Sequence, residues 1–250
     1  QVPGAKNSVL KLMAATLLAE GDYVLTNVPA ITDVHTMAET LGALGVSSTW
    51  LGPHELSLTN SGNITPEVPF EKFDKMRASL NVLGPLLTHY GSARINWPGG
   101  DDFGGRPINL HVEGLQKMGA TVEEGLYDIF AVADRLKGTN IELDIPSVGA
   151  TENLLTAAIY ARGVTVIDNA AREPEVQDLC NMLIAMGADI EGIGTSRLII
   201  HGCERGSLKS TKHAVVPDRV QAATYMAAVA VAGGDIVVRT ARTEHMEELL

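Results

Sequence analysis

KNSVLKLMAATLLAEGDYV, at residues 6–24, decides the fold because its plan recurs along the chain. The segment consists of an apolar helical run, a glycine and a short β-branched strand. Residues 77–95, 151–166 and 218–238 repeat this plan. The glycines recur every 70 to 72 residues, and they are Gly21, Gly91, Gly163 and Gly234. Such regular spacing is typical of an internal structural repeat.

A second helical motif recurs in step with the first. DVHTMAETLGALGV, NLHVEGLQKMGATV and EVQDLCNMLIAMGADI place apolar residues at helical spacing and close with a C-cap glycine before a strand. Each unit is therefore predicted to run helix–strand–helix–strand–strand, or βαβαββ with the preceding strand. One unit cannot bury both helices, so we expect an α/β fold with shared interior helices and outer sheets. Three units form one domain, and a fourth begins near Pro217.

The first helix of each unit is the more apolar one and is expected in the interior, as LLTAAIYA and YMAAVAVA illustrate. Cations stand at the starts of these helices, at Lys6 beside Asn7, at Arg77, and at Arg219 beside Asp218. A buried helix start offers free N–H groups and partial positive charge, so it favours an anion. The alternative for each position is a capped helix with a solvated side chain.

Composition excludes several classes of function. The 250 residues are 45% hydrophobic and carry a formal net charge of −11, which argues against binding to nucleic acid. No apolar run is long enough to span a membrane. The seven histidines show no paired ligand spacing, so no metal is expected, and the two cysteines suit reduced thiols. Both ends of the chain are predicted to be truncated.

Residues 98–107, PGGDDFGGRP, are predicted to form a loop or lid over a site. Four glycines and two prolines make the segment unsuitable for a core strand. The alternative is a long surface turn.

Several motifs together resemble one family. They are GAKN at 4–7, MRAS at 76–79, LGPL at 83–86, PGG…GGRPINLH at 98–111, PSVGAT at 146–151, AREPE at 171–175 and VPDR at 216–219. Their combination resembles the UDP-N-acetylglucosamine 1-carboxyvinyltransferases, which are enolpyruvyl transferases. The related branch that makes enolpyruvyl-shikimate phosphate ranks lower, because its opening motif is closer to GSKS.

The resemblance implies an inside-out α/β barrel of six βαβαββ units in two domains, of which about four units are present. Residues 6–216 would form the first domain, and residues 1–5 and 217–250 an incomplete part of the second. The missing C-terminal half of the chain would supply the rest of the site. The implied protein is cytoplasmic and uses no cofactor.

The implied reaction transfers the enolpyruvyl group of phosphoenolpyruvate to the 3′-hydroxyl of UDP-N-acetylglucosamine and releases phosphate, the first committed step of peptidoglycan synthesis. Lys6 with Asn7, and the arginines Arg77 and Arg106, match positions near phosphoenolpyruvate. Lysine suits a phosphate that changes geometry, and an arginine fork holds an oxyanion with two bonds.

The acceptor would be held by two other segments. Arg106, Pro107, Ile108, Asn109 and Leu110 match the family's grip on the uridine, and Ser147, Val148 and Gly149 match its support of the nucleotide. Two positions depart from the family pattern: Asn109 stands where many members have Asp, and Ile145 where some have Lys. Asn109 lacks the charge of Asp, and Ile145 leaves a phosphate contact missing.

Asp101 stands where most members of the family have the cysteine that donates a proton and reacts with fosfomycin. A carboxylic acid donates that proton if desolvation or the neighbouring Asp102 raises its pKa. It forms no stable thioether, so the sequence predicts an enzyme insensitive to fosfomycin. Two other functions stay open: a paralogue that acts on another nucleotide in secondary metabolism, and a non-catalytic homologue that binds a UDP-sugar.

Overall fold

The computed structural model describes residues 1–68, 77–97, 108–247 and 249–250, and of residues 77–79 it describes the backbone alone. Three successive units follow the predicted order of elements. The first contains α1 (Lys6–Ala15), the 3-10 turn η1 (Thr16–Leu18), β1 (Gly21–Thr26), α2 (Thr32–Leu44), β2 (Val46–Gly52) and β3 (Glu55–Asn60). The second contains η2 (Arg77–Val82), α4 (Leu83–Tyr90), β4 (Ser92–Asn96), α5 (Asn109–Lys117), β5 (Thr121–Glu124) and β6 (Asp128–Val132).

The third unit contains β7 (Asn140–Glu142), α6 (Val148–Ala158), β8 (Val164–Asp168), α7 (Pro174–Met186), β9 (Asp189–Glu191) and β10 (Arg197–His201). It is followed by β11 (Lys212–Ala214), α8 (Arg219–Ala232) and η3 (Thr243–His245). The repeat predicted from the glycine spacing is thus confirmed for three units.

Each unit builds its own sheet in one pattern. The last strand of the unit lies between the other two and pairs antiparallel with both, giving β1-β3-β2, β4-β6-β5 and β8-β10-β9. Two of these sheets gain a further parallel strand: β7 pairs with β8, and β11 pairs with β1. Because β11 follows the third unit and pairs with the first, the chain returns to its start.

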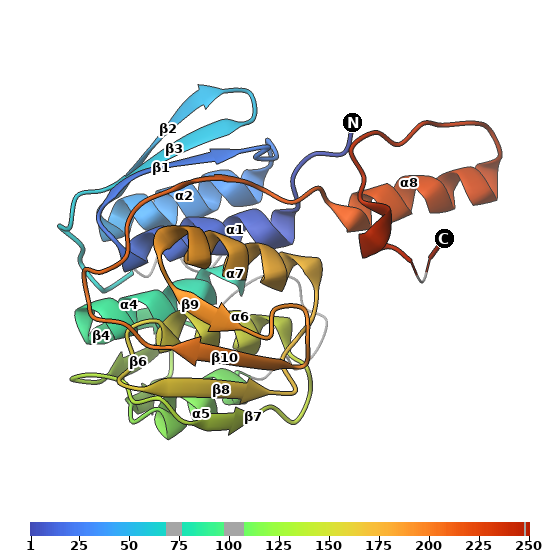
Figure 1. Ribbon diagram of the computed structural model, residues 1–250. Coiled ribbons are helices and arrows are strands. Elements are labelled where there is room, and N and C mark those ends of the chain that lie inside the picture. The colour runs from blue at the N-terminus through green and yellow to red at the C-terminus, as the bar shows by residue number, and fades with distance from the viewer. Residues whose placement is uncertain (69–76, 98–107, 248) are drawn as a thin grey trace.

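The helices lie inside the body and the sheets lie outside it (Figure 1). Residues Ala150–Ala158 of α6 are all buried, as are Ser8–Ala15 of α1. Gly84 allows α4 to approach α6 closely, since a Cβ there would lie 2.4 Å from the carbonyl oxygen of Asn153. The α/β arrangement with interior helices is confirmed. The finer prediction of a closed barrel stays a prediction, because the sheets of the described residues are separate.

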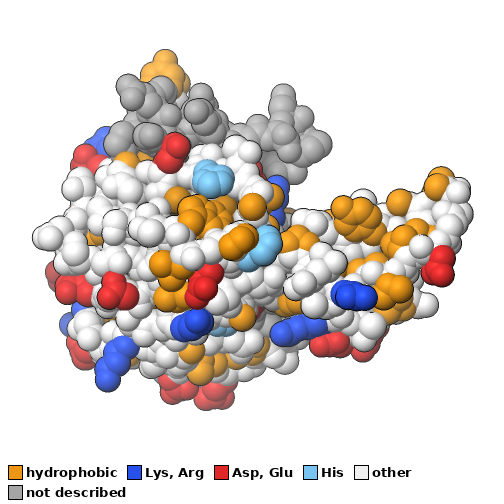
Figure 2. Space-filling model, turned by 90° about the horizontal axis from the view of Figure 1, so that it is seen from above, with side chains coloured by type: hydrophobic (Ala, Val, Ile, Leu, Met, Phe, Trp, Pro, Cys, Tyr) orange, Lys and Arg blue, Asp and Glu red, His pale blue; other side chains and the backbone are white. Residues whose placement is uncertain are grey.

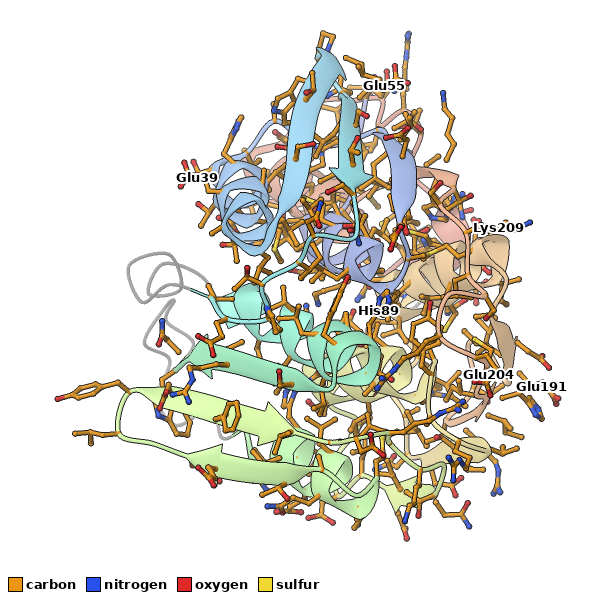
Figure 3. All side chains as sticks on the ribbon, turned by 90° about the vertical axis from the view of Figure 1, so that its left-hand side faces the viewer. Glu39, Glu55, His89, Glu191, Glu204 and Lys209 are labelled. Atoms are coloured by element: carbon orange, nitrogen blue, oxygen red, sulfur yellow. The ribbon has the colours of Figure 1, made fainter. Side chains whose placement is uncertain are left out.

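The C-terminal ends of the interior helices are sealed by side chains. Tyr160 donates its hydroxyl to the carbonyl oxygen of Leu18 at 2.5 Å, and Nδ1 of His89 lies 2.9 Å from that of Leu17. Figure 3 shows His89 inside the body, whereas Glu39 and Glu55 stand at its outer edge. Burial lowers the pKa of His89 and raises the pKa of Tyr160. These donors satisfy carbonyl groups that a helix end leaves without partners.

The fourth repeat departs from the prediction. The helix α8 was expected in the interior, but Ala222 is its one buried residue in the described part of the chain. The described residues after Gly234 contain no strand. The reason is that α8 stands apart from the body, with little chain packed against it (Figure 1). Hydrophobic side chains therefore gather on the surface of this arm (Figure 2), where Val231 is 90% exposed.

The buried apolar side chains of the described residues form two clusters. The large one runs from Val9 to Val215, and the small one joins Val2 to Ala222 and Met246. This division supports the predicted domain boundary near Pro217, which stays a prediction. Among the described residues, no helix is long and apolar enough to cross a membrane.

Candidate active site

In the described part of the chain, five helices begin at one cavity of about 330 Å³. Its walls come from the first turns of α1, α5, α6, α7 and α8, and from η2. The polar side chains that line it are Asn7, Lys11, Asn81, His111, Glu173, Glu175 and Arg219. Helix N-termini carry partial positive charge, so their convergence makes this cavity favourable for an anion.

In the described part of the chain, several of these helices begin without a side-chain cap. The residues before α1, α5 and α7 are Ala5, Ile108 and Glu173, and none of the three side chains caps its helix. By contrast, Ser147 caps α6 and Asp218 caps α8 with a side-chain oxygen. Uncapped first-turn N–H groups remain available to a bound ligand.

A larger hollow of about 860 Å³ lies beside α8 and shares Arg219 with the first cavity. Its walls are α7, the arm that carries α8, and residues 244–247 and 249. Of the predicted site residues whose side chains are described, Asn7, Val148 and Gly149 line the smaller cavity and none lines the larger one. The smaller cavity is therefore the better candidate.

The two residues predicted at the start of α1, Lys6 and Asn7, have different surroundings. Asn7 lines the cavity. Lys6 is exposed and places its Nζ 3.3 Å from a carboxylate oxygen of Asp33 on α2. An ion pair between half-exposed groups is weak, so Lys6 is free to leave Asp33 for a stronger anion.

The predicted acceptor segments are placed as follows. Val148 and Gly149 line the cavity, and the Ser147 hydroxyl accepts the Ala150 N–H at 3.3 Å as a helix cap. Ile108 is buried and Leu110 is half-buried. Asn109 is exposed and donates Nδ2 to Oε1 of Glu113 on its own helix at 3.3 Å.

Asp101, Arg106 and Pro107 lie outside the described residues, as does the predicted loop at 98–107. For Arg77 only the backbone is described, at the start of η2. The roles assigned to these residues therefore stay predictions.

Lys11 was missed by the sequence analysis. It lies one helical turn after Asn7 on the same face of α1, and the i, i+4 spacing was the available signal. Its Nζ forms a buried ion pair with Oε2 of Glu152 on α6, 141 residues away. Burial raises the pKa of Glu152, and the Lys11 ammonium opposes that shift. The second carboxylate oxygen of Glu152 has no hydrogen-bond partner among the described residues.

Arg219 faces the cavity from the first position of α8. Its guanidinium donates to both carboxylate oxygens of Glu175, with Nε 3.1 Å from Oε1 and Nη2 3.2 Å from Oε2. Glu175 is 4% exposed, so the pair is shielded from water on one side. The sequence analysis had noted Arg219 only as a cation at a helix start, and it had not connected Glu175 with the site.

His111 is fixed by a chain of hydrogen bonds. The Gly84 N–H donates to Oδ1 of Asn153 at 2.7 Å, so the amide presents Nδ2 to Nδ1 of His111 at 3.0 Å. Nδ1 is then an acceptor, and the proton of a neutral ring lies on Nε2. The ring also lies against Gly149, where a Cβ would be 3.4 Å from Cε1. The cavity therefore has a rigid donor on this side.

The family of the chain follows from a comparison with known families. The model of EPSP synthase (3-phosphoshikimate 1-carboxyvinyltransferase) matches residues 1–250. The chain belongs to this enolpyruvyl transferase family. The predicted resemblance to enolpyruvyl transferases is thus confirmed at the level of the family. The matching description names the shikimate branch, which the motifs ranked below the UDP-sugar branch, so the acceptor stays a proposal.

Solved structures show the same fold. The enolpyruvyl transferase NikO from Streptomyces tendae is 24% identical with a TM-score of 0.80, over 91% of this chain and 53% of that one. EPSP synthase from Acinetobacter baumannii is 20% identical with a TM-score of 0.72, over 92% of this chain and 52% of that one. The chain therefore spans about half the length of these structures.

Proposed function

We propose that this chain forms the phosphoenolpyruvate-binding half of an enolpyruvyl transferase, and that its acceptor is the 3′-hydroxyl of UDP-N-acetylglucosamine. The observation that carries the proposal is the convergence of five helix N-termini on the cavity of Asn7. Phosphoenolpyruvate brings a phosphate and a carboxylate, which are the groups that helix starts and cations stabilise. Residues 6–216 would form the domain that carries this half-site in a cytoplasmic protein.

The reaction proceeds by addition and then elimination. The acceptor hydroxyl loses its proton and its oxygen bonds to C2 of phosphoenolpyruvate, while an acid delivers a proton to C3. The resulting tetrahedral phospho-ketal then loses phosphate from C2 and a proton from C3, which restores the C2–C3 double bond and leaves the acceptor as an enol ether. Asp101 is the proposed acid for C3, because the family places its proton donor at that position of the loop. The uncapped helix starts and Arg106 stabilise the phosphate as its charge develops.

Support for a nucleotide acceptor comes from residues 147–149. Val148 and Gly149 are the first residues of α6 and line the cavity. The His111 ring, which carries its proton on Nε2 when neutral, lies against Gly149. Backbone at a helix start allows close approach of a ligand, and Gly149 has no side chain in the way.

Two observations favour the second candidate, a paralogue that acts on another nucleotide. Asn109 directs its Nδ2 to Glu113 rather than toward the cavity. Ile145 is 62% exposed and offers no cation for a diphosphate. Recognition of uracil and diphosphate would then rest on fewer contacts than in the family pattern.

Phosphate release tests the proposal directly. Purified full-length protein is given phosphoenolpyruvate with UDP-N-acetylglucosamine, UMP or shikimate 3-phosphate in separate reactions. We expect rapid release with UDP-N-acetylglucosamine alone. Release with UMP alone would establish the paralogue, and release with shikimate 3-phosphate would overturn the acceptor assignment. Absence of release together with binding of UDP-N-acetylglucosamine would establish the non-catalytic homologue.

Fosfomycin tests the assignment of Asp101. The wild-type enzyme should keep its activity after incubation with fosfomycin, because a carboxylate forms no stable thioether. The Asp101→Cys variant should turn over substrate and lose activity irreversibly, with the adduct mapped to residues 98–107. Irreversible inactivation of the wild-type enzyme, with a label in that loop, would contradict the assignment.

A further inference from the structure

Two separate segments of the chain, residues 3–8 and 213–218, make three hydrogen bonds to one buried carboxylate, that of Asp178 on α7. Oδ2 accepts the Ser8 hydroxyl at 2.5 Å and the Val216 N–H at 3.0 Å. Oδ1 lies 2.8 Å from Nε2 of His213. Asp178 is 7% exposed and Ser8 is fully buried, so water has little access to these hydrogen bonds.

The segments that meet at Asp178 lead directly to the cavity. Ser8 follows Asn7, which lines the cavity, and Val216 stands three residues before Arg219, which lines it from the other side. Backbone bonds join the same two segments: the Ala5 N–H donates to the Val216 carbonyl at 2.8 Å, and the Asp218 N–H donates to the Pro3 carbonyl at 2.9 Å. The two segments therefore run side by side as they pass from the body to α8.

A second carboxylate of α7 completes the arrangement. Glu175 stands one turn before Asp178 on the same face of the helix, and it holds the Arg219 guanidinium in two hydrogen bonds. One face of α7 thus fixes both the backbone before α8 and the first side chain of α8.

We propose that Asp178 is a positioning residue, which holds the start of α1 and the 215–218 segment together so that Asn7 and Arg219 face one anionic ligand. The inference rests on the proposed function and deepens it. Asp178 touches no substrate and acts through the segments that it holds. Each bond to an ionised carboxylate is stronger than one between neutral groups, so three of them fix the relative place of the segments.

Substitutions at Asp178 and His213 test the inference in the full-length protein. Asp178→Asn keeps the shape but turns one acceptor into a donor, which then faces donors. His213→Leu removes one donor to Asp178, and His213→Gln restores a donor at a similar reach. The matched control is Asp128→Asn. This variant breaks the ion pair between Asp128 Oδ2 and Arg94 Nη1, which are 2.7 Å apart and belong to strands that do not line the cavity.

The first readout is steady-state kinetics with phosphoenolpyruvate and UDP-N-acetylglucosamine, below the melting temperature of every variant. We expect Asp178→Asn to raise the KM for phosphoenolpyruvate about tenfold, the factor that corresponds to one charge-assisted bond. His213→Leu should raise it less, His213→Gln should return it to the wild-type value, and Asp128→Asn should leave it unchanged. A loss of folded enzyme alone lowers kcat and leaves KM unchanged, so unchanged KM values in Asp178→Asn would overturn the inference.

The second readout is hydrogen exchange in the absence of substrate, which does not depend on the proposed function. Asp178→Asn should speed exchange in residues 5–11 and 215–221 together, with residues 21–26 unchanged. Equal acceleration across all three ranges, or none at 5–11 and 215–221, would overturn the positioning role. A wild-type protein that neither binds nor turns over the two substrates would instead overturn the proposed function, and the exchange data would still decide the role of Asp178.

Discussion

The two ends of the interior helices differ in how their backbone groups are used. At the C-terminal end, Tyr160 and His89 bond the carbonyl oxygens of Leu18 and Leu17, respectively. At the N-terminal end, α1, α5 and α7 begin without side-chain caps around a cavity of about 330 Å³. The segment α1–η1 thus ends with carbonyl groups bonded by side chains and begins without a side-chain cap at the cavity. Substitutions of buried side chains should change folding at either end, whereas substitutions of exposed side chains at the open end should change binding.

The largest loss of stability is expected at the sealed end. Tyr160→Ala removes a fully buried ring and its hydroxyl bond, so it should lower the free energy of unfolding by about 4 kcal/mol. Denaturant unfolding measures the loss. The matched control is Tyr225→Ala on α8, where the side chain is 60% exposed and the change should stay within about 0.5 kcal/mol. Similar losses for both variants would contradict the difference between the body and the arm.

Lys11→Met should cost about 3 kcal/mol at neutral pH, because it leaves the Glu152 carboxylate buried without a cation. Burial already raises the pKa of Glu152, and removal of Lys11 raises it further. A carboxyl whose pKa is higher in the folded state destabilises the fold as the pH rises above its unfolded pKa, so the cost should shrink in acid. Unfolding at a series of pH values checks this. An equal loss of stability at acid and neutral pH would show that the cost does not come from the unpaired Glu152 carboxylate.

Gly84→Ala should destabilise the protein by about 2 kcal/mol, because the added Cβ would lie 2.4 Å from the Asn153 carbonyl oxygen. The shift of Asn153 should also disturb His111 and weaken binding at the cavity. Gly42→Ala on α2 is the control, since a Cβ there meets nothing within 4 Å and alanine favours a helix. Thermal unfolding compares the two variants, and a control as unstable as Gly84→Ala would remove the close contact as the cause.

The smallest effect on stability is expected at the open end, at Asn7. Its side chain is exposed at the start of α1, so Asn7→Leu should change the free energy of unfolding by no more than about 0.5 kcal/mol. The same variant should bind phosphoenolpyruvate about tenfold more weakly, as for the loss of one hydrogen bond to a charged group. Calorimetric titration measures this affinity. Undiminished affinity would separate Asn7 from the ligand.

The sequence predicted the three units well because their signals are local. Apolar spacing, the strand after each glycine and the left-handed φ of Gly45, Gly91 and Gly187 all depend on a few neighbouring residues. The fourth repeat has the same pattern, but α8 is exposed because burial depends on what packs against a helix. A pattern shows which face a helix can bury, and only the rest of the structure shows whether it does so.

The site was predictable in part, for the same reason. Asn7, Val148 and Gly149 belong to motifs and line the cavity. Lys11 and Glu152 are 141 residues apart in the sequence, so no local pattern predicts their ion pair. The Asn109 bond to Glu113 spans four residues of one helix, so it was available from the sequence and was overlooked. Predictions for Asp101 and Arg106 remain for experiment.

Protection of backbone N–H groups by phosphoenolpyruvate tests the central claim most directly. Hydrogen exchange of the full-length protein is measured with and without the ligand, over the helix starts and the sealed helix ends. The account predicts that phosphoenolpyruvate slows exchange at residues 6–10, 109–113 and 174–178 and leaves residues 86–90 and 156–160 unchanged. Protection of the sealed ends, or binding without protection of the helix starts, would contradict it.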